Sequence, residues 1–120
     1  MKYTVKLDNI EIGKSKLEFA DPPMGIVFGK LFLKVESGFD LFKNHCVKNN
    51  IQFTEYPDDK LITTFNIPGL KAYRENGNEI VGEISISGID SDFEITIMGI
   101  AYPYYEEEFP EHVKRYNEMF

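Results

Sequence analysis

The sequence has a single cysteine, Cys46, among its 120 residues. One cysteine cannot form an intramolecular disulfide or supply a cysteine-rich zinc site, so disulfide-stapled and zinc-finger folds are excluded. The lone thiol is typical of a protein in the reducing cytoplasm, or of one that is indifferent to redox conditions. Cys46 shares a predicted helical face with Phe39 and Phe42, and we therefore expect it to be a core residue rather than a reactive thiol.

Long apolar runs are also missing. The densest apolar stretch, from Ile26 to Val35, is interrupted by Gly29, Lys30 and Lys34, whereas a membrane-spanning helix needs about 20 apolar residues. The first eight residues alternate polar and apolar side chains instead of forming the apolar run of a secretory signal. These patterns predict a soluble cytoplasmic protein without a membrane partner.

Motifs for catalysis and for cofactors are scarce. The two histidines, His45 and His112, have no second His or Cys at a helical ligand spacing. The chain has no nucleophile elbow and no glycine-rich phosphate loop. The segment from Asp90 to Glu94 lacks the glycine and the distal glutamate of a calcium loop. We predict no catalytic residue, no metal and no cofactor; a catalytic pair would require the fold to bring Cys46 to His112.

The acidic residues are concentrated in one half of the chain. Residues 51–120 hold 14 Asp and Glu against 5 Lys and Arg, a net charge of −9, while residues 1–50 hold 6 against 8, a net charge of +2. Binding of DNA, RNA or anionic lipid requires a basic surface, so we expect none of these partners. The acidic half favours a basic protein as the partner.

The segment from Tyr102 to Glu108 is the first candidate contact surface. Tyrosine offers rigid contact area with a polar tip, and carboxylates pair with Arg or Lys, which is the composition of interface hot spots. The candidate residues here are Tyr102, Tyr104, Tyr105, Glu106, Glu107 and Glu108. The alternative is that the glutamates form a solvated first helical turn while the tyrosines pack on the sheet.

Acidic turns add a second group of candidates. Asp90, Asp92 and Glu94 surround one predicted turn, and Asp58-Asp59 occupies another; both would widen the negative surface. Lys30 and Lys34 alternate with Phe28 and Phe32, a pattern that could stack nucleic acid. Lysines on a strand near a sheet edge more commonly prevent edge pairing, and the net charge opposes polyanion binding.

Period-two alternation of apolar residues predicts strands, and a 3.6-residue period predicts helices. The predicted strands cover residues 3–7, 16–20, 26–36, 51–56, 61–67, 80–87 and 93–101, and Leu70 to Arg74 resumes the hairpin pairing after Pro68-Gly69. Helices are expected at about 38–49 and 109–119, and the 80–87 and 93–101 pair is expected at the centre. We predict a single α+β domain over residues 1–120, with a mostly antiparallel sheet of about six or seven strands.

The Tyr104-Tyr105 pair beside carboxylates resembles, in its chemistry, the hot spot by which immunity proteins of nuclease bacteriocins hold their basic toxins. Those immunity proteins are helical bundles, so the likeness is one of chemistry and not of fold. In size, acidity and α+β character the chain is also similar to the wider set of bacterial toxin-immunity proteins. The resemblance implies a non-enzymatic protein that binds a basic, nuclease-type toxin and inhibits it by occlusion.

Two other function classes stay open at this stage. One is a small-ligand-binding or enzymatic α+β domain that uses buried carboxylates such as Glu83 or Glu94 as acid or base. The other is a structural module that forms a homodimer through its sheet edges.

Overall fold

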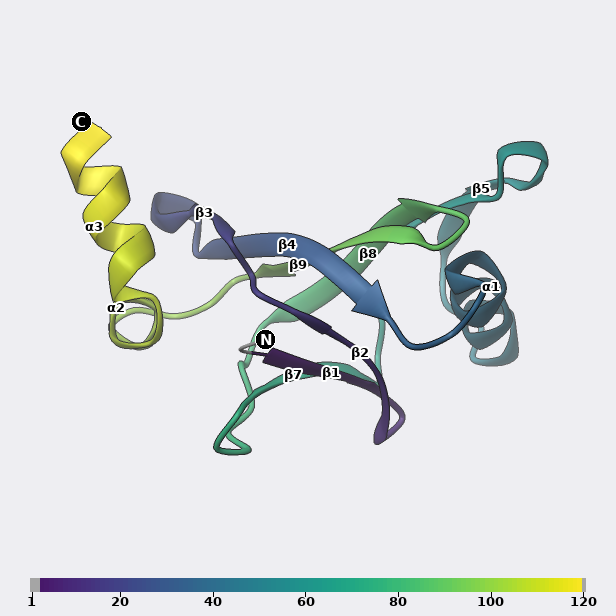
Figure 1. Cartoon of the computed structure of the whole chain (residues 1–120), viewed down its shortest axis with the longest axis horizontal. Helices are drawn as coiled ribbons and strands as arrows, with labels where there is room; N and C mark the ends of the chain where they lie inside the picture. Colours follow the sequence, from purple (N-terminus) through teal and green to yellow (C-terminus); the bar gives the residue numbers. More distant parts are fainter. Residues whose placement is uncertain (1–2, 120) are drawn as a thin grey trace.

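The computed structural model describes residues 3–119, which form one antiparallel sheet with helices at its two ends (Figure 1). Nine strands lie within these residues: β1 (Tyr3–Leu7), β2 (Ile10–Ser15), β3 (Phe19–Asp21), β4 (Ile26–Leu33), β5 (Phe53–Tyr56), β6 (Leu61–Thr64), β7 (Leu70–Arg74), β8 (Glu83–Ile89) and β9 (Asp92–Met98). The helices are α1 (Gly38–Lys48), α2 (Tyr104–Glu108) and α3 (Pro110–Met119), and short 3₁₀ turns span η1 (Pro22–Met24) and η2 (Pro57–Asp59).

The predicted α+β class and the mostly antiparallel sheet are confirmed, and α1 and α3 match the two expected helices. The Ser37 side chain caps α1 by accepting a hydrogen bond of 3.2 Å from the Asp40 N–H. The sheet has more strands than expected, and α2 is an additional short helix.

The strand predicted at residues 16–20 is correct only for Phe19 and Ala20, which belong to β3, and is wrong for residues 16–18. β2 ends at Ser15 and β3 begins at Phe19, and between them Leu17 has a positive φ of 45°. The Leu17 N–H bonds the Ser15 hydroxyl at 3.1 Å. This turn breaks the alternation, so Leu17 is buried while Phe19 is exposed. β2 and β3 then pair in succession with the two ends of β4.

The strand order is β5-β6-β8-β9-β4-β2-β1-β7, with β3 beside β4. β8 and β9 pair near the middle of the sheet, as predicted. Residues 70–74 do not resume the hairpin with β6, because β7 pairs with β1 at the far end of the order. The chain crosses over near Ile67, whose N–H bonds the Ile84 carbonyl at 2.9 Å, and Pro68-Gly69 follows immediately.

One face of the sheet packs the core. α1 contributes Phe42, whose ring lies 5.2 Å from that of Phe93, and α2 and its C-cap contribute Tyr105 and Phe109 at the opposite end (Figure 1). Cys46 is fully buried in α1, and burial raises the pKa of its thiol. Among residues 3–119, no helix has the length and apolar character needed to cross a membrane.

Candidate partner-binding surfaces

Tyr105, a predicted contact residue, is a core residue. Its side chain is fully buried, and its hydroxyl donates a hydrogen bond of 2.9 Å to the Ile26 carbonyl. Its ring centroid lies 5.3 Å from that of Tyr102 and 5.4 Å from that of Phe109. A side chain enclosed in this way has no surface for a partner, and burial raises the pKa of its phenol.

Tyr102 and Tyr104 are tied to the fold by their hydroxyls. Tyr102 donates to the Pro22 carbonyl at 2.8 Å, and Tyr104 donates to the Glu79 carbonyl at 3.3 Å. Tyr102 remains 49% exposed. Of the three tyrosines, Tyr102 therefore offers the most exposed surface to a partner. Tyr104 and Tyr105 instead follow the alternative given by the sequence, in which the tyrosines pack on the sheet.

The three glutamates of α2 lie in different surroundings. Glu106 and Glu107 are exposed. The Glu108 side chain is 4% exposed, and its Oε1 lies 3.0 Å from Arg74 Nε. Burial raises the pKa of the Glu108 carboxyl, and the nearby Arg74 guanidinium lowers it by less. Glu108 is therefore an internal ion-pair residue, while Glu106 and Glu107 are free to face a partner.

Glu108→Gln should stabilise the protein near pH 7. A raised folded-state pKa means that folded Glu108 holds its proton more tightly than the unfolded chain does, so stability is lost as pH rises above the unfolded value of about 4.3. Glutamine cannot ionise, so the gain over wild type should vanish near pH 4. Thermal unfolding from pH 3 to 8 measures this, with exposed Glu106→Gln as the control. A Glu108→Gln variant less stable than wild type at pH 7 would show that the Arg74 pair outweighs burial.

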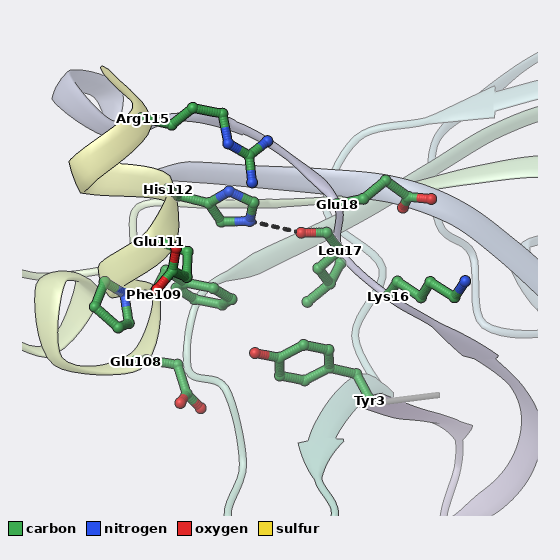
Figure 2. A pocket seen from close by; sticks show the side chains of 10 residues that line it. Tyr3, Lys16, Leu17, Glu18, Glu108, Phe109, Glu111, His112 and Arg115 are labelled. Carbon is green, nitrogen blue, oxygen red and sulfur yellow. Dashed lines mark hydrogen bonds between the residues drawn. The ribbon is translucent and has the colours of Figure 1, made fainter. Parts of the chain in front are cut away.

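A groove runs between α3 on one side and, on the other, Tyr3 of β1 and the segment from Lys16 to Glu18 that connects β2 to β3 (Figure 2). It has a volume of about 610 Å³, and Tyr3, Leu17 and Phe109 form its apolar floor. His112 projects from α3 and its Nε2 lies 2.8 Å from the Leu17 carbonyl oxygen. Burial, and then the Glu108 carboxylate, raises the pKa of Tyr3 to about 12. The rim mixes Lys16 and Arg115 with acidic side chains, so the groove has no single charge preference.

The structure brings the two acidic turns together. The Asp90 N–H bonds the Lys60 carbonyl at 2.9 Å, which places η2 beside the β8–β9 turn. Four exposed aspartates meet there, and we call them the acidic tip: Asp58, Asp59, Asp90 and Asp92. The Phe39 N–H bonds the Asp90 carbonyl at 2.8 Å, so exposed Asp40 in the first turn of α1 lies close by.

Two exposed apolar side chains border the acidic tip. Tyr56 pairs in register with Leu61 on β6, and Leu61 pairs with Ile89 on β8. Tyr56 is 59% exposed and Ile89 is 51% exposed. Register partners on neighbouring strands point to the same face, so this row joins an aromatic and an aliphatic side chain to the aspartates. Sequence reasoning missed both residues, because the row exists only once β6 pairs with β8.

The predicted contact residues do not form one surface. Tyr102 to Glu108 lie at the α2 end of the sheet, whereas Asp90 and Asp92 lie at the α1 end (Figure 1). Glu94 lies within the sheet on β9, in register with Lys30 of β4. Glu83 and Glu94, the carboxylates of the enzymatic alternative, are both exposed.

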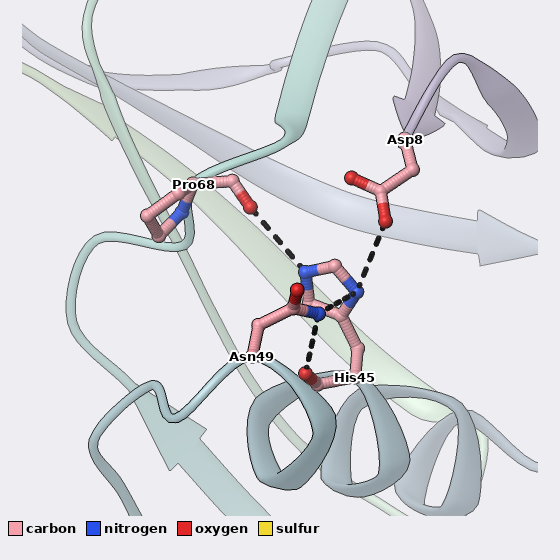
Figure 3. A network of polar contacts seen from close by, with 4 residues as sticks. All are labelled: Asp8, His45, Asn49 and Pro68. Atoms are coloured by element: carbon pink, nitrogen blue, oxygen red, sulfur yellow. Dashed lines mark hydrogen bonds and ion pairs between the residues drawn. The ribbon is translucent and has the colours of Figure 1, made fainter.

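His45 joins three segments of the fold (Figure 3). Its Nε2 lies 3.3 Å from the Pro68 carbonyl oxygen, and its Nδ1 lies 3.6 Å from Asp8 Oδ2. Asn49 Nδ2 is 3.3 Å from the same Nδ1. Because a carbonyl can only accept, Nε2 carries a proton in this arrangement. The network connects α1 to the β1–β2 turn and to the crossover.

Neither cysteine chemistry nor a metal site emerges from residues 3–119. Cys46 lies in α1 and His112 in α3, at opposite ends of the sheet in Figure 1. Within the described part of the chain, no group of three His, Cys, Asp or Glu side chains is placed to hold a metal ion.

Comparisons of the chain with protein-family models, with curated proteins and with solved structures give no match.

Proposed function

We propose that this chain is a non-enzymatic, acidic binding protein, and specifically an immunity protein that neutralises a basic, nuclease-type bacterial toxin by occlusion. The observation that carries the proposal is the acidic tip with Tyr56 and Ile89 beside it. Exposed apolar side chains rimmed by polar and charged residues are typical of a protein contact surface, and here the rim holds the four aspartates together with Lys60.

The chemistry of the acidic tip suits a nuclease as the partner. A nuclease must present basic side chains to the phosphates of its substrate. Carboxylates that reach those side chains first would compete with the phosphates, and bulk around them would close the cleft. In this arrangement Tyr56 and Ile89 anchor the contact, while the four aspartates steer the encounter and pair with Lys or Arg.

The acidic residues at the α2 end have a secondary role in this proposal. Glu106 and Glu107 lie at the opposite end of the sheet from the acidic tip, with half-exposed Tyr102 nearby. They add to the negative field that attracts a basic partner, and a large partner could also reach them.

Neutralising the acidic tip tests the proposal. Asp58→Asn, Asp59→Asn, Asp90→Asn and Asp92→Asn together should slow association with a basic toxin domain about tenfold or more at low salt. The wild-type rate should itself fall as salt shortens the Debye length from about 30 Å at 0.01 M to about 8 Å at 0.15 M. Tyr56→Ala should instead speed dissociation.

The probe for this test is a purified basic nuclease domain, taken from a secreted protein if one is encoded beside this chain's gene. Stopped-flow mixing or surface binding gives both rate constants. The matched control neutralises Glu106, Glu107, Glu111 and Glu118, four exposed carboxylates at the other end. If the control slowed association more than the acidic-tip variant does, the contact surface would lie at α2 and α3 instead. A salt-independent rate in the wild type would contradict the electrostatic basis of the proposal.

A further inference from the structure

The face of the sheet opposite the core, which we call the outer face, carries a continuous set of side chains from eight strands. Register places Phe19, Phe28, Thr96 and Ser85 in one row. Lys30, Glu94, Ser87 and Thr63 form the next row. Tyr73, Thr4, Lys14 and Phe32 form a third. On β4, Phe28, Lys30 and Phe32 alternate with buried residues, so all three rows share one face.

The outer face exposes aromatic rings. Phe19 is 52% exposed and stacks on Phe28 at 5.3 Å between centroids, and Phe32 is 40% exposed. Lys30 Nζ lies 5.1 Å from the centroid of the Phe32 ring. Phe42 and Tyr105, which pack α1 and α2 on the sheet, belong to the core on the other face. Aromatic side chains gathered on an open sheet face indicate a contact surface.

Charge divides the outer face into two halves. The half formed by β4, β2, β1 and β7 carries four lysines: Lys6, Lys14, Lys30 and Lys71. Glu11 on this half pairs with Lys34, and Asp21 lies at the end of β3. The half formed by β9 and β8 carries exposed Glu83, Asp92 and Glu94 among hydroxyl side chains. The boundary runs between β4 and β9, where Lys30 and Glu94 are register partners.

We infer that the outer face binds a second copy of this chain. A two-fold axis parallel to the strands, lying over the β4–β9 boundary, would place each β4 against β9 of the other copy. Lys30 would then face Glu94 of the partner subunit, and the reciprocal contact would follow from the symmetry. The phenylalanines of each copy would be covered at the same time. A face with one basic and one acidic half complements itself, whereas a uniformly basic partner would be repelled by the lysine half.

This inference does not depend on the proposed toxin binding. Asp58, Asp59 and Asp90 of the acidic tip lie in turns, whereas Asp92 with Tyr56 and Ile89 lies on the outer face at its α1 end. The dimer contact is centred farther along the strands, at Lys30 and Glu94. Neutralising Asp58, Asp59 and Asp90 should therefore leave dimerisation nearly unchanged. A failure of either idea can be recognised without reference to the other.

Exchange of the two central charges gives a sharp test. Lys30→Glu puts Glu against Glu twice across the axis, and Glu94→Lys puts Lys against Lys twice. Each variant alone should lower the association constant of the dimer about a hundredfold, because each of the two like-charge contacts should lower it about tenfold. An equimolar mixture of the two should dimerise again, because every contact then joins Glu to Lys. Sedimentation velocity over a dilution series measures each association constant.

Matched controls separate charge from position. Lys48→Glu on α1 and Glu118→Lys on α3 make the same charge changes at exposed sites away from the outer face, and they should dimerise like wild type. Thermal unfolding checks that each variant folds. If the reversals unfold the chain, Phe32→Ser on the outer face and Val47→Ser on α1 replace them, and only the former should weaken the dimer. A monomeric wild type, or a mixture that stays monomeric, would overturn the inference.

Discussion

Replacing Tyr105 by alanine should destabilise the protein by about 3–5 kcal/mol, the cost of removing a buried aromatic side chain. Tyr105 is fully buried and contacts two other aromatic rings, Tyr102 and Phe109. Its hydroxyl fixes α2 to the first residue of β4. In a chain of this length, the loss should lower the midpoint of thermal unfolding by more than about 10 °C.

Two companion variants make the interpretation specific. Tyr105→Phe removes only the hydrogen bond to the Ile26 carbonyl and should cost about 1 kcal/mol. Tyr102→Ala, on the half-exposed ring stacked on Tyr105, should cost much less than Tyr105→Ala. A Tyr105→Ala protein with wild-type stability and weakened partner binding would make Tyr105 an interface residue and contradict its place in the core.

Local patterns predicted the elements whose signals lie within a few residues. Phe39, Phe42 and Cys46 recur at helical spacing after the capping Ser37, and α1 forms there with these residues buried. Alternation in Tyr3, Val5 and Leu7 predicted β1 in the same way. In these segments, local preference and burial in the core agree.

Other features depend on contacts distant in sequence. Leu17 and Phe19 look alike in an alternating pattern, but the left-handed turn at Leu17 sends one inward and the other outward. The pairing of β7 with β1 joins residues nearly 70 positions apart, and no local signal specifies it.

The candidate sites show the same limit. A tyrosine beside glutamates has the composition of a hot spot and equally that of a helix packed on a sheet, because tyrosine serves both uses. Tyr105 is buried because its hydroxyl bonds the Ile26 carbonyl and its ring packs against Phe109, two contacts that the local sequence does not reveal. Likewise, the aspartates of the two acidic turns were visible in the sequence, but their meeting required β6 to pair with β8.

Gly25→Ala should be the most damaging of the simple glycine changes in the turns, with an expected loss of about 2–4 kcal/mol. Gly25 has a φ of +66°, and a left-handed conformation costs an L-residue about 1 kcal/mol or more. A Cβ at this position would lie 2.7 Å from the Ile100 carbonyl oxygen. That oxygen belongs to the backbone, so it cannot move aside as a side chain would.

The close approach at Gly25 holds two distant segments together. The Ile100 N–H bonds the Gly25 carbonyl at 3.0 Å, and the Gly25 N–H bonds the Pro22 carbonyl at 3.0 Å. Residue 100 leads directly into α2, so a displaced Ile100 would disturb the docking of Tyr105 as well. The substitution therefore combines backbone strain, a steric clash and weakened packing of α2.

Gly77→Ala is the matched control, because Gly77 has a φ of +90° but no heavy atom within 4 Å of a built Cβ. Its free energy of unfolding should fall only by the cost of holding alanine in a left-handed backbone conformation, about 1–2 kcal/mol. Urea unfolding of both variants measures the difference directly. Equal losses of stability in the two variants would mean that the contact with Ile100 adds no cost. Backbone strain alone would then explain why position 25 needs a glycine. A larger loss at Gly25 would assign the excess to the junction between η1, β4 and the segment that enters α2.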